Sequence, residues 1–165
     1  MKLRPYRCGE DFSLIESWIT GERTHALWCA GRFPWPLTRV GFEGRLKELA
    51  EKSGDIPLVG ETWEGESVGF VCFSPGPAGG EGKLKFVLVD PEKRSLGLGR
   101  ELVTLAAEYG RACAGAETVR LSVFTVNAAA IRCYERAGFV SERTEEGAYA
   151  FHEERWGRRT MALRL

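Results

Sequence analysis

The chain has 165 residues, of which 23 are basic and 23 acidic, so its formal net charge is zero. This length fits one compact domain with a single core, spanning residues 1–165. The balanced charge provides no global field that would draw the chain to nucleic acid or to an anionic membrane. A non-specific DNA binder is therefore disfavoured, whereas chemistry on small molecules stays open.

The five cysteines are scattered along the chain without a C-x-x-C pair, so we expect neither a metal site nor a disulfide framework. The basic start of the chain is not followed by an apolar run, so no signal peptide is expected. No segment approaches the roughly 20 apolar residues of a membrane span. These features predict a reduced, cytoplasmic monomer or homodimer.

The first third of the chain predicts one strand and two helices. Residues 2–7 resemble a short edge strand, and apolar residues at helical spacing predict a helix over residues 10–20. Residues 24–36 are aromatic but irregular, because Gly and Pro interrupt them. A second helix is expected from a cap at Thr38 to about Lys52.

From Ile56 onward the hydrophobic period changes to that of strands. The expected elements are two strands within residues 56–74 joined at 64–67, a turn at 74–82, a strand at 83–89, a helix at 98–115, a strand at 118–126, a helix at 127–139, and extended segments at 139–146 and 158–165. This order predicts an α/β domain with a mixed sheet flanked by helices.

The junction between the strand at 83–89 and the following helix predicts a phosphate site. A helix N-terminus presents unpaired N–H groups and a partial positive charge. Gly97 and Gly99 would leave the amides from Ser95 to Arg100 uncovered, as a concave nest for an anion. Arg94 and Arg100 add charged donors, so the turn suits a pyrophosphate.

The turn also allows two other interpretations. A dinucleotide-binding oxidoreductase is disfavoured, because Leu102 stands where G-x-G-x-x-G requires its third glycine. A tight strand-to-helix turn without a ligand is the other alternative.

A second group of residues follows one strand later. Asn127 and Tyr134 are seven residues apart and therefore share a helix face, with the small Ala130 between them. Tyr134 could aim its phenol at a ligand between this helix and the glycine turn. The alternatives are a core tyrosine and an ordinary Asn cap.

The stretch "RSLGLG", Arg94 to Gly99, resembles the acyl-CoA signature of the GNAT N-acetyltransferase superfamily, and "NAAAIRCYERAGF" is similar to its next motif. The ends of the chain are similar to the branch related to ribosomal-protein N-terminal acetyltransferases. The resemblance implies a GNAT-like, mostly antiparallel twisted sheet flanked by helices. It also implies acetyl-CoA as the donor and a small-molecule or peptide amine as the acceptor, without a metal.

The resemblance also implies roles for individual residues. Amides of residues 95–100 would hold the pyrophosphate, the backbone of residues 87–89 would pair with the pantetheine arm, and an amide near Val89 would polarise the thioester. Asn127 would touch the arm, and Tyr134 would protonate the departing thiolate. The expected cofactor-binding residues are Val87, Leu88, Val89, Arg94, Ser95, Leu96, Gly97, Leu98, Gly99, Arg100, Asn127, Ala130 and Tyr134, with Tyr134 catalytic.

The residue that removes the proton from the amine stays open in the sequence. His25, His152, Glu153 and Glu154 are candidates, as is water, and each side chain could equally be an ordinary polar residue. A covalent acetyl-cysteine is disfavoured, because helical geometry should turn Cys133 away from the face of Tyr134.

In GNAT enzymes the acceptor site is walled by the segment after the first helix and by the C-terminal hairpin. Here the first wall would contain Trp28, Phe33 and Trp35, unless they form a small core cluster instead. The second wall is acidic and could attract a cationic amine through Glu145, Glu146, Glu153 and Glu154. A non-catalytic module that senses acetyl-CoA is the alternative to an enzyme.

Overall fold

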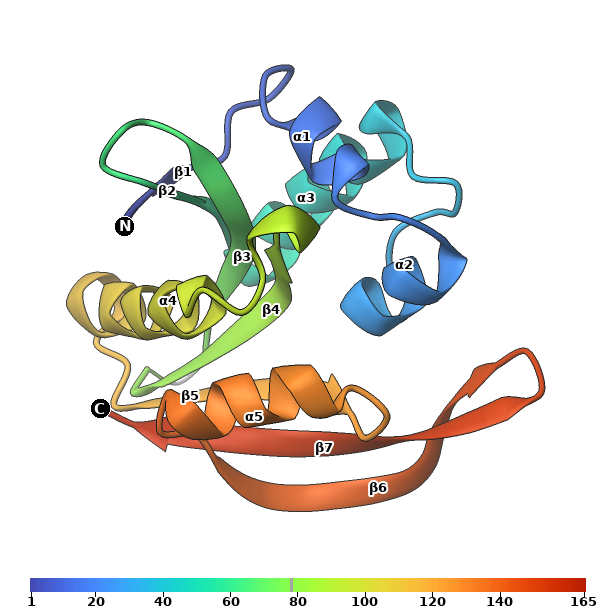
Figure 1. Ribbon diagram of the computed structural model, residues 1–165. Coiled ribbons are helices and arrows are strands. Elements are labelled where there is room, and N and C mark those ends of the chain that lie inside the picture. Colours follow the sequence, from blue (N-terminus) through green and yellow to red (C-terminus); the bar gives the residue numbers. More distant parts are fainter. Residues whose placement is uncertain (78) are drawn as a thin grey trace.

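The computed structural model describes residues 1–77 and 79–165. Among them, a seven-stranded sheet has the order β1-β2-β3-β4-β5-β7-β6, and every neighbouring pair is antiparallel except β4 with β5 (Figure 1). The mostly antiparallel sheet expected from the sequence is confirmed. The strands are β1 Lys2–Pro5, β2 Ile56–Glu61, β3 Ser67–Pro75, β4 Glu81–Val89, β5 Thr118–Phe124, β6 Val140–Phe151 and β7 Glu154–Arg164.

Helices cover both faces of this sheet and bury two core clusters. α4 and α5 pack on one face around residues such as Leu102, Ala106 and Ile131. α1 to α3 pack on the other face around Phe42, Phe70 and other aromatic side chains. The helices are α1 Phe12–Ser17, α2 Glu22–Cys29, α3 Arg39–Ser53, the 3-10 turn η1 Pro91–Lys93, α4 Leu98–Ala114 and α5 Ala128–Arg136.

The structure corrects two parts of the expected layout. Residues 24–36 are not irregular throughout, because α2 occupies Glu22–Cys29 and ends where Ala30 adopts a left-handed φ of 52°. The prolines that suggested a break lie after this helix. The C-terminal strands are also longer than expected, so residues 145–154 belong mainly to a hairpin of β6 and β7. Ala78, in the predicted turn at 74–82, lies outside the described residues.

An ion-pair network holds the edge strand β1 against the start of the first helix. Arg4 donates to Asp11 at 2.8 Å and to Glu61 at 2.7 Å. Asp11 also accepts from the Arg7 amide at 2.7 Å. Burial alone would raise the pKa of Asp11, but the hydrogen bonds from Arg4 and Arg7 outweigh it and hold the pKa below its ordinary value.

The sheet opens at its centre, between β4 and β5. The two strands pair only as far as Leu84 and Leu121. A bulge also interrupts the pairing of β4 with β3, where Phe86 takes a φ of 54°. The indole Nε1 of Trp28 donates to the Phe86 carbonyl at 2.9 Å and so stabilises this bent backbone. The second half of β4 therefore has no strand partner on its β5 side.

Candidate active site

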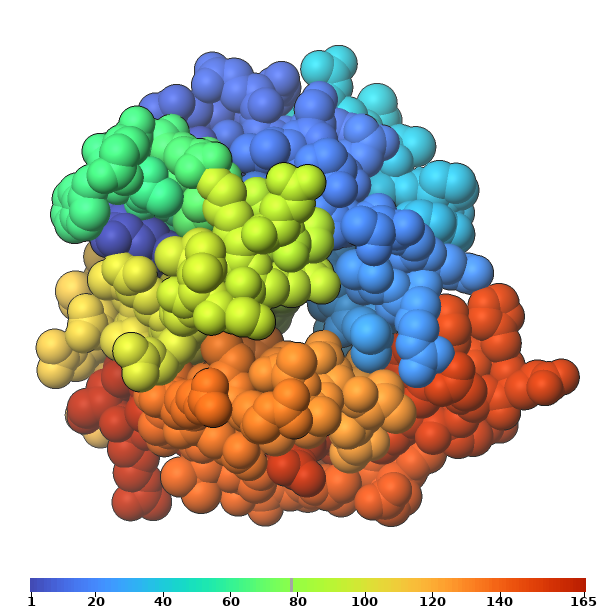
Figure 2. Space-filling model, in the orientation of Figure 1, coloured from blue at the N-terminus to red at the C-terminus, as the bar shows by residue number. Residues whose placement is uncertain are grey.

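A cavity of about 1310 Å³ occupies the opening between β4 and β5. Figure 2 shows it as a hollow between α2, α5 and the turn that precedes α4. The volume exceeds the roughly 300–1,000 Å³ of typical small-molecule pockets. Of the expected cofactor-binding residues, these line it: Val87, Leu88, Val89, Arg94, Ser95, Gly97, Gly99, Arg100, Asn127, Ala130 and Tyr134.

The turn before α4 leaves its amides uncovered. Ser95 and Gly97 have φ values of 66° and 82°, and Gly97 caps the helix. No backbone carbonyl of the described residues accepts a hydrogen bond of good geometry from the N–H groups of residues 95–100, although the chain turns tightly at Arg94 and Ser95. Leu96 and Leu98 contribute backbone to this turn, but they are absent from the cavity lining; the Leu96 side chain is 72% exposed. This geometry fits an anion.

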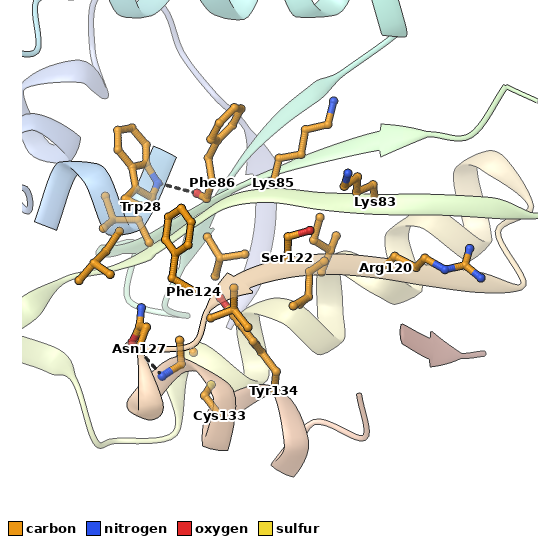
Figure 3. A pocket seen from close by; sticks show the side chains of 18 of the residues that line it. Trp28, Lys83, Lys85, Phe86, Arg120, Ser122, Phe124, Asn127, Cys133 and Tyr134 are labelled. Carbon is orange, nitrogen blue, oxygen red and sulfur yellow. Dashed lines mark hydrogen bonds between the residues drawn. The ribbon is translucent and has the colours of Figure 1, made fainter. Parts of the chain in front are cut away.

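Asn127 and Tyr134 project into the cavity from α5 (Figure 3). Asn127 caps the helix, because its side chain accepts from the Ala130 amide at 3.2 Å. Tyr134 is 8% exposed, and no described side chain hydrogen-bonds its hydroxyl group. Burial, followed by the neighbouring Cys133, raises the pKa of this phenol well above its ordinary value, so it stays protonated at neutral pH.

Cys133 does not turn away from the site as expected. It lines the cavity beside Tyr134, and its Sγ lies 3.0 Å from where a Cβ on Gly99 would stand. Burial raises the pKa of this thiol, so the neutral form dominates. A protonated thiol is a poor nucleophile, so an acetyl-cysteine route stays disfavoured. The reason is the protonation of the thiol and not, as expected, its orientation.

None of the four side chains considered as the base lines the cavity. Glu154 pairs with Arg23 and accepts from Trp156, and His152 lies 3.2 Å from Glu22. His25 is buried, and burial lowers its pKa. Glu153 also lies outside the cavity lining. The sequence could not place these residues, because their position depends on how the C-terminal hairpin packs against α2.

The acceptor walls also differ from those expected. Phe33 and Trp35 do not line the cavity, and Phe33 is buried in the aromatic core; only Trp28 of the three does. None of the four glutamates of the expected acidic wall (Glu145, Glu146, Glu153 and Glu154) lines it either.

Basic and hydroxyl side chains take the place of the expected acidic wall. Lys83 and Lys85 of β4 and Arg120 and Ser122 of β5 line the cavity on the α2 side of the sheet (Figure 3). Sequence reasoning missed them. The alternating patterns "KLK" and "RLS" could have signalled that each pair points to one face of its strand.

Within residues 1–77 and 79–165, no three His, Cys, Asp or Glu side chains gather in a way that could hold a metal ion. Over the same ranges, every helix is too short or too polar to traverse a bilayer.

The mixed sheet that opens beside a glycine turn agrees with the GNAT-like architecture that the sequence resembles. Residues 22–139 match the acetyltransferase (GNAT) family, and the chain belongs to this family.

Similar proteins include mycothiol acetyltransferases. That of Kytococcus sedentarius is 40% identical over 144 residues, which cover 84% of this chain and 45% of the relative. That of Thermobispora bispora is 41% identical over 91 residues, covering 55% of this chain and 28% of the relative. The chain thus spans less than half the length of these relatives.

Among solved structures, spermidine N-acetyltransferase from Vibrio cholerae in complex with CoA and spermine aligns with a TM-score of 0.82. The two chains share 19% identity, and the alignment covers 99% of this chain and 94% of the other. At this identity the likeness shows a common fold.

Proposed function

We propose that this protein is an acetyl-CoA-dependent N-acetyltransferase that moves an acetyl group directly to a primary amine within a ternary complex. The observation that carries the proposal is the uncovered row of amides at residues 95–100, which opens into the cavity between β4 and β5. The cavity volume of about 1310 Å³ has room for a cofactor arm and an acceptor together.

The cofactor-binding residues would act mainly through backbone groups. Amides of residues 95–100 would bind the pyrophosphate, with Arg94 and Arg100 as additional donors. The side of residues 87–89 that faces away from β3 has no strand partner, so its N–H and C=O groups can pair with the pantetheine arm. Asn127 would donate to the same arm with its free amide nitrogen.

Tyr134 would act as the general acid. Because its pKa is raised, the phenol carries its proton at neutral pH and can donate it to the departing thiolate. An amide near Val89 would stabilise the oxyanion.

Among the described residues, the cavity lining contains a single carboxylate, Glu81, which is bound to Arg120 at 2.8 Å, and no histidine. We therefore propose that water takes the proton of the attacking amine.

The finer assignments rest on the sequence. The closer similarity to ribosomal-protein N-terminal acetyltransferases stays a prediction, since the relatives described above are mycothiol and spermidine acetyltransferases. The cytoplasmic location and the monomeric or homodimeric state are likewise predictions.

The test is to combine native mass spectrometry for bound acetyl-CoA with a thiol-release assay over a panel of amines. An enzyme binds acetyl-CoA and releases thiol faster when one of the amines is present. A protein that binds acetyl-CoA but gives no amine-dependent release would instead be the sensor module. A protein that does not bind acetyl-CoA at all would contradict both functions.

A further inference from the structure

The part of the cavity on the α2 side of the sheet is lined by six cationic side chains. They come from four adjacent strands and from the loop after α2, and they are Arg32, Lys83, Lys85, Arg120, Arg143 and Arg158. Glu81 is the one carboxylate among the described residues that line the whole cavity. The charge balance of the chain as a whole is therefore not reproduced in this cavity.

Half of these cations are already neutralised by ion pairs. Lys85 binds Asp55 at 2.8 Å, Arg120 binds Glu81 and Glu142, each at 2.8 Å, and Arg158 binds Glu145 at 2.7 Å. These three are held in place by carboxylates and are poorly suited to bind a further anion.

The other three cations have no carboxylate partner among the described residues. They are Arg32, Lys83 and Arg143. Partial removal from water, followed by repulsion from Arg32 and other nearby cations, lowers the pKa of the Lys83 amine. A negative group bound beside Lys83 would relieve this repulsion.

The strand register places hydroxyl donors between these cations. Thr160 of β7 lies opposite both Ser122 of β5 and Arg143 of β6. Lys83 lies on β4, on the other side of β5, and pairs with Arg120, two residues before Ser122. At about 4.8 Å per strand, β4 and β6 are roughly 14 Å apart, and the offset of two residues adds about 7 Å along the strand direction. The long side chains of Lys83 and Arg143 can therefore bind one group held above Ser122 and Thr160 when both extend toward it.

The group formed by Lys83, Ser122, Arg143 and Thr160, called the cluster below, is separate from the glycine turn at residues 94–99. Leu84 packs with α4 and α5, whereas Lys83 and Lys85 alternate onto the opposite face, on which α2 and α3 lie. Lys83 and Val89, at the start of the turn, are six positions apart along β4, roughly 20 Å of extended chain. The turn has its own donors for a phosphate, so these cations are available for a different group.

We infer that the acceptor amine carries an anionic group, a carboxylate or a phosphate, which Lys83 and Arg143 bind beside Ser122 and Thr160. This inference rests on the proposed function and specifies its acceptor. A polyamine would meet like charge at this face, so the acceptor differs in charge from the spermidine named for the structural neighbour from Vibrio cholerae.

The experiment compares pairs of amines that differ by one anionic group in two assays. The pairs are β-alanine with β-alaninamide and O-phosphoethanolamine with ethanolamine, and spermidine is added as a cation. Equilibrium binding is measured by calorimetry on the protein saturated with CoA, and thiol release is measured with acetyl-CoA. We expect at least one amine that carries an anionic group to bind tenfold or more tightly than its partner without that group, and the pair in which this occurs distinguishes carboxylate from phosphate.

Two variants assign this preference to the cluster. Lys83→Met and Arg143→Met should each weaken binding of the preferred amine about tenfold, while binding of its partner without the anionic group and of CoA is unchanged. Lys52→Met removes an exposed cation of α3 that does not line the cavity and should change nothing.

The outcomes separate the inference from the proposed function. Equal binding of the two members of each pair, tightest binding of spermidine, or an anion preference that survives both variants would overturn the inference. Anion-selective binding that is lost in Lys83→Met, without thiol release from any amine, would support the inference and contradict the proposed transferase activity.

Discussion

Replacing Gly97 by Ala tests the cofactor site, and Gly115 provides a matched control at the other end of the same helix. Gly97 and Gly115 cap α4 with φ values of 82° and 64°. A Cβ added at either position has no heavy atom within 4 Å. Each substitution therefore costs backbone strain alone, about 1–2 kcal/mol for a left-handed residue. For a chain of this size, that lowers the unfolding temperature by roughly 2–8 °C.

The two variants should differ in cofactor binding. Only Gly97 lies in the turn whose amides face the cavity, so a methyl group there obstructs the approach of a phosphate. We expect Gly97→Ala to weaken acetyl-CoA binding at least tenfold in calorimetry and Gly115→Ala to leave it unchanged, with similar thermal shifts in both. Unchanged affinity in Gly97→Ala, or equal losses in the two variants, would refute the assignment of this turn.

Three further substitutions test other parts of the structure. Tyr134→Phe should lower kcat about 100-fold in the thiol-release assay with CoA affinity retained; undiminished turnover would exclude the phenol as the acid. Asp11→Asn should lose about 2 kcal/mol of unfolding free energy at pH 7, because hydrogen bonds to a charged partner are lost. The pKa of Asp11 is lower in the folded chain than its ordinary value of 3.8, so the carboxylate stabilises the fold at pH values above about 4. The difference in unfolding free energy between the native chain and Asp11→Asn should therefore shrink as the pH falls below about 4 in denaturant titrations. A pH-independent difference would contradict this. Trp28→Phe should cost about 1 kcal/mol in the same titrations, because the Phe86 carbonyl loses its donor; equal stability would show that this hydrogen bond contributes little.

The elements from β2 onward and the position of the glycine turn could be predicted because their signals are local. The turn at residues 94–99 combines glycines with a change from strand to helix period, and the spacing of Asn127 and Tyr134 follows from one helix. Each of these features lies within a single stretch of sequence, and the structure brings them into one cavity.

The acceptor side could not be predicted, because it depends on pairing between distant strands. Glu145 looks available in the sequence, but the hairpin places it against Arg158. Lys83 and Arg143 are 60 residues apart, and only the register through β5 and β7 sets them on one face. α2 was missed because the prolines just after it suggested a broken segment, whereas burial of Ala26 and Cys29 stabilises the helix.

The separation of β4 from β5 has a kinetic consequence. Because the cavity reaches both faces of the sheet, the donor and acceptor of the proposed reaction can approach from opposite sides. Either molecule can then bind first. Steady-state measurements should accordingly show random-order addition, in which CoA competes with acetyl-CoA and the acetylated amine competes with its parent.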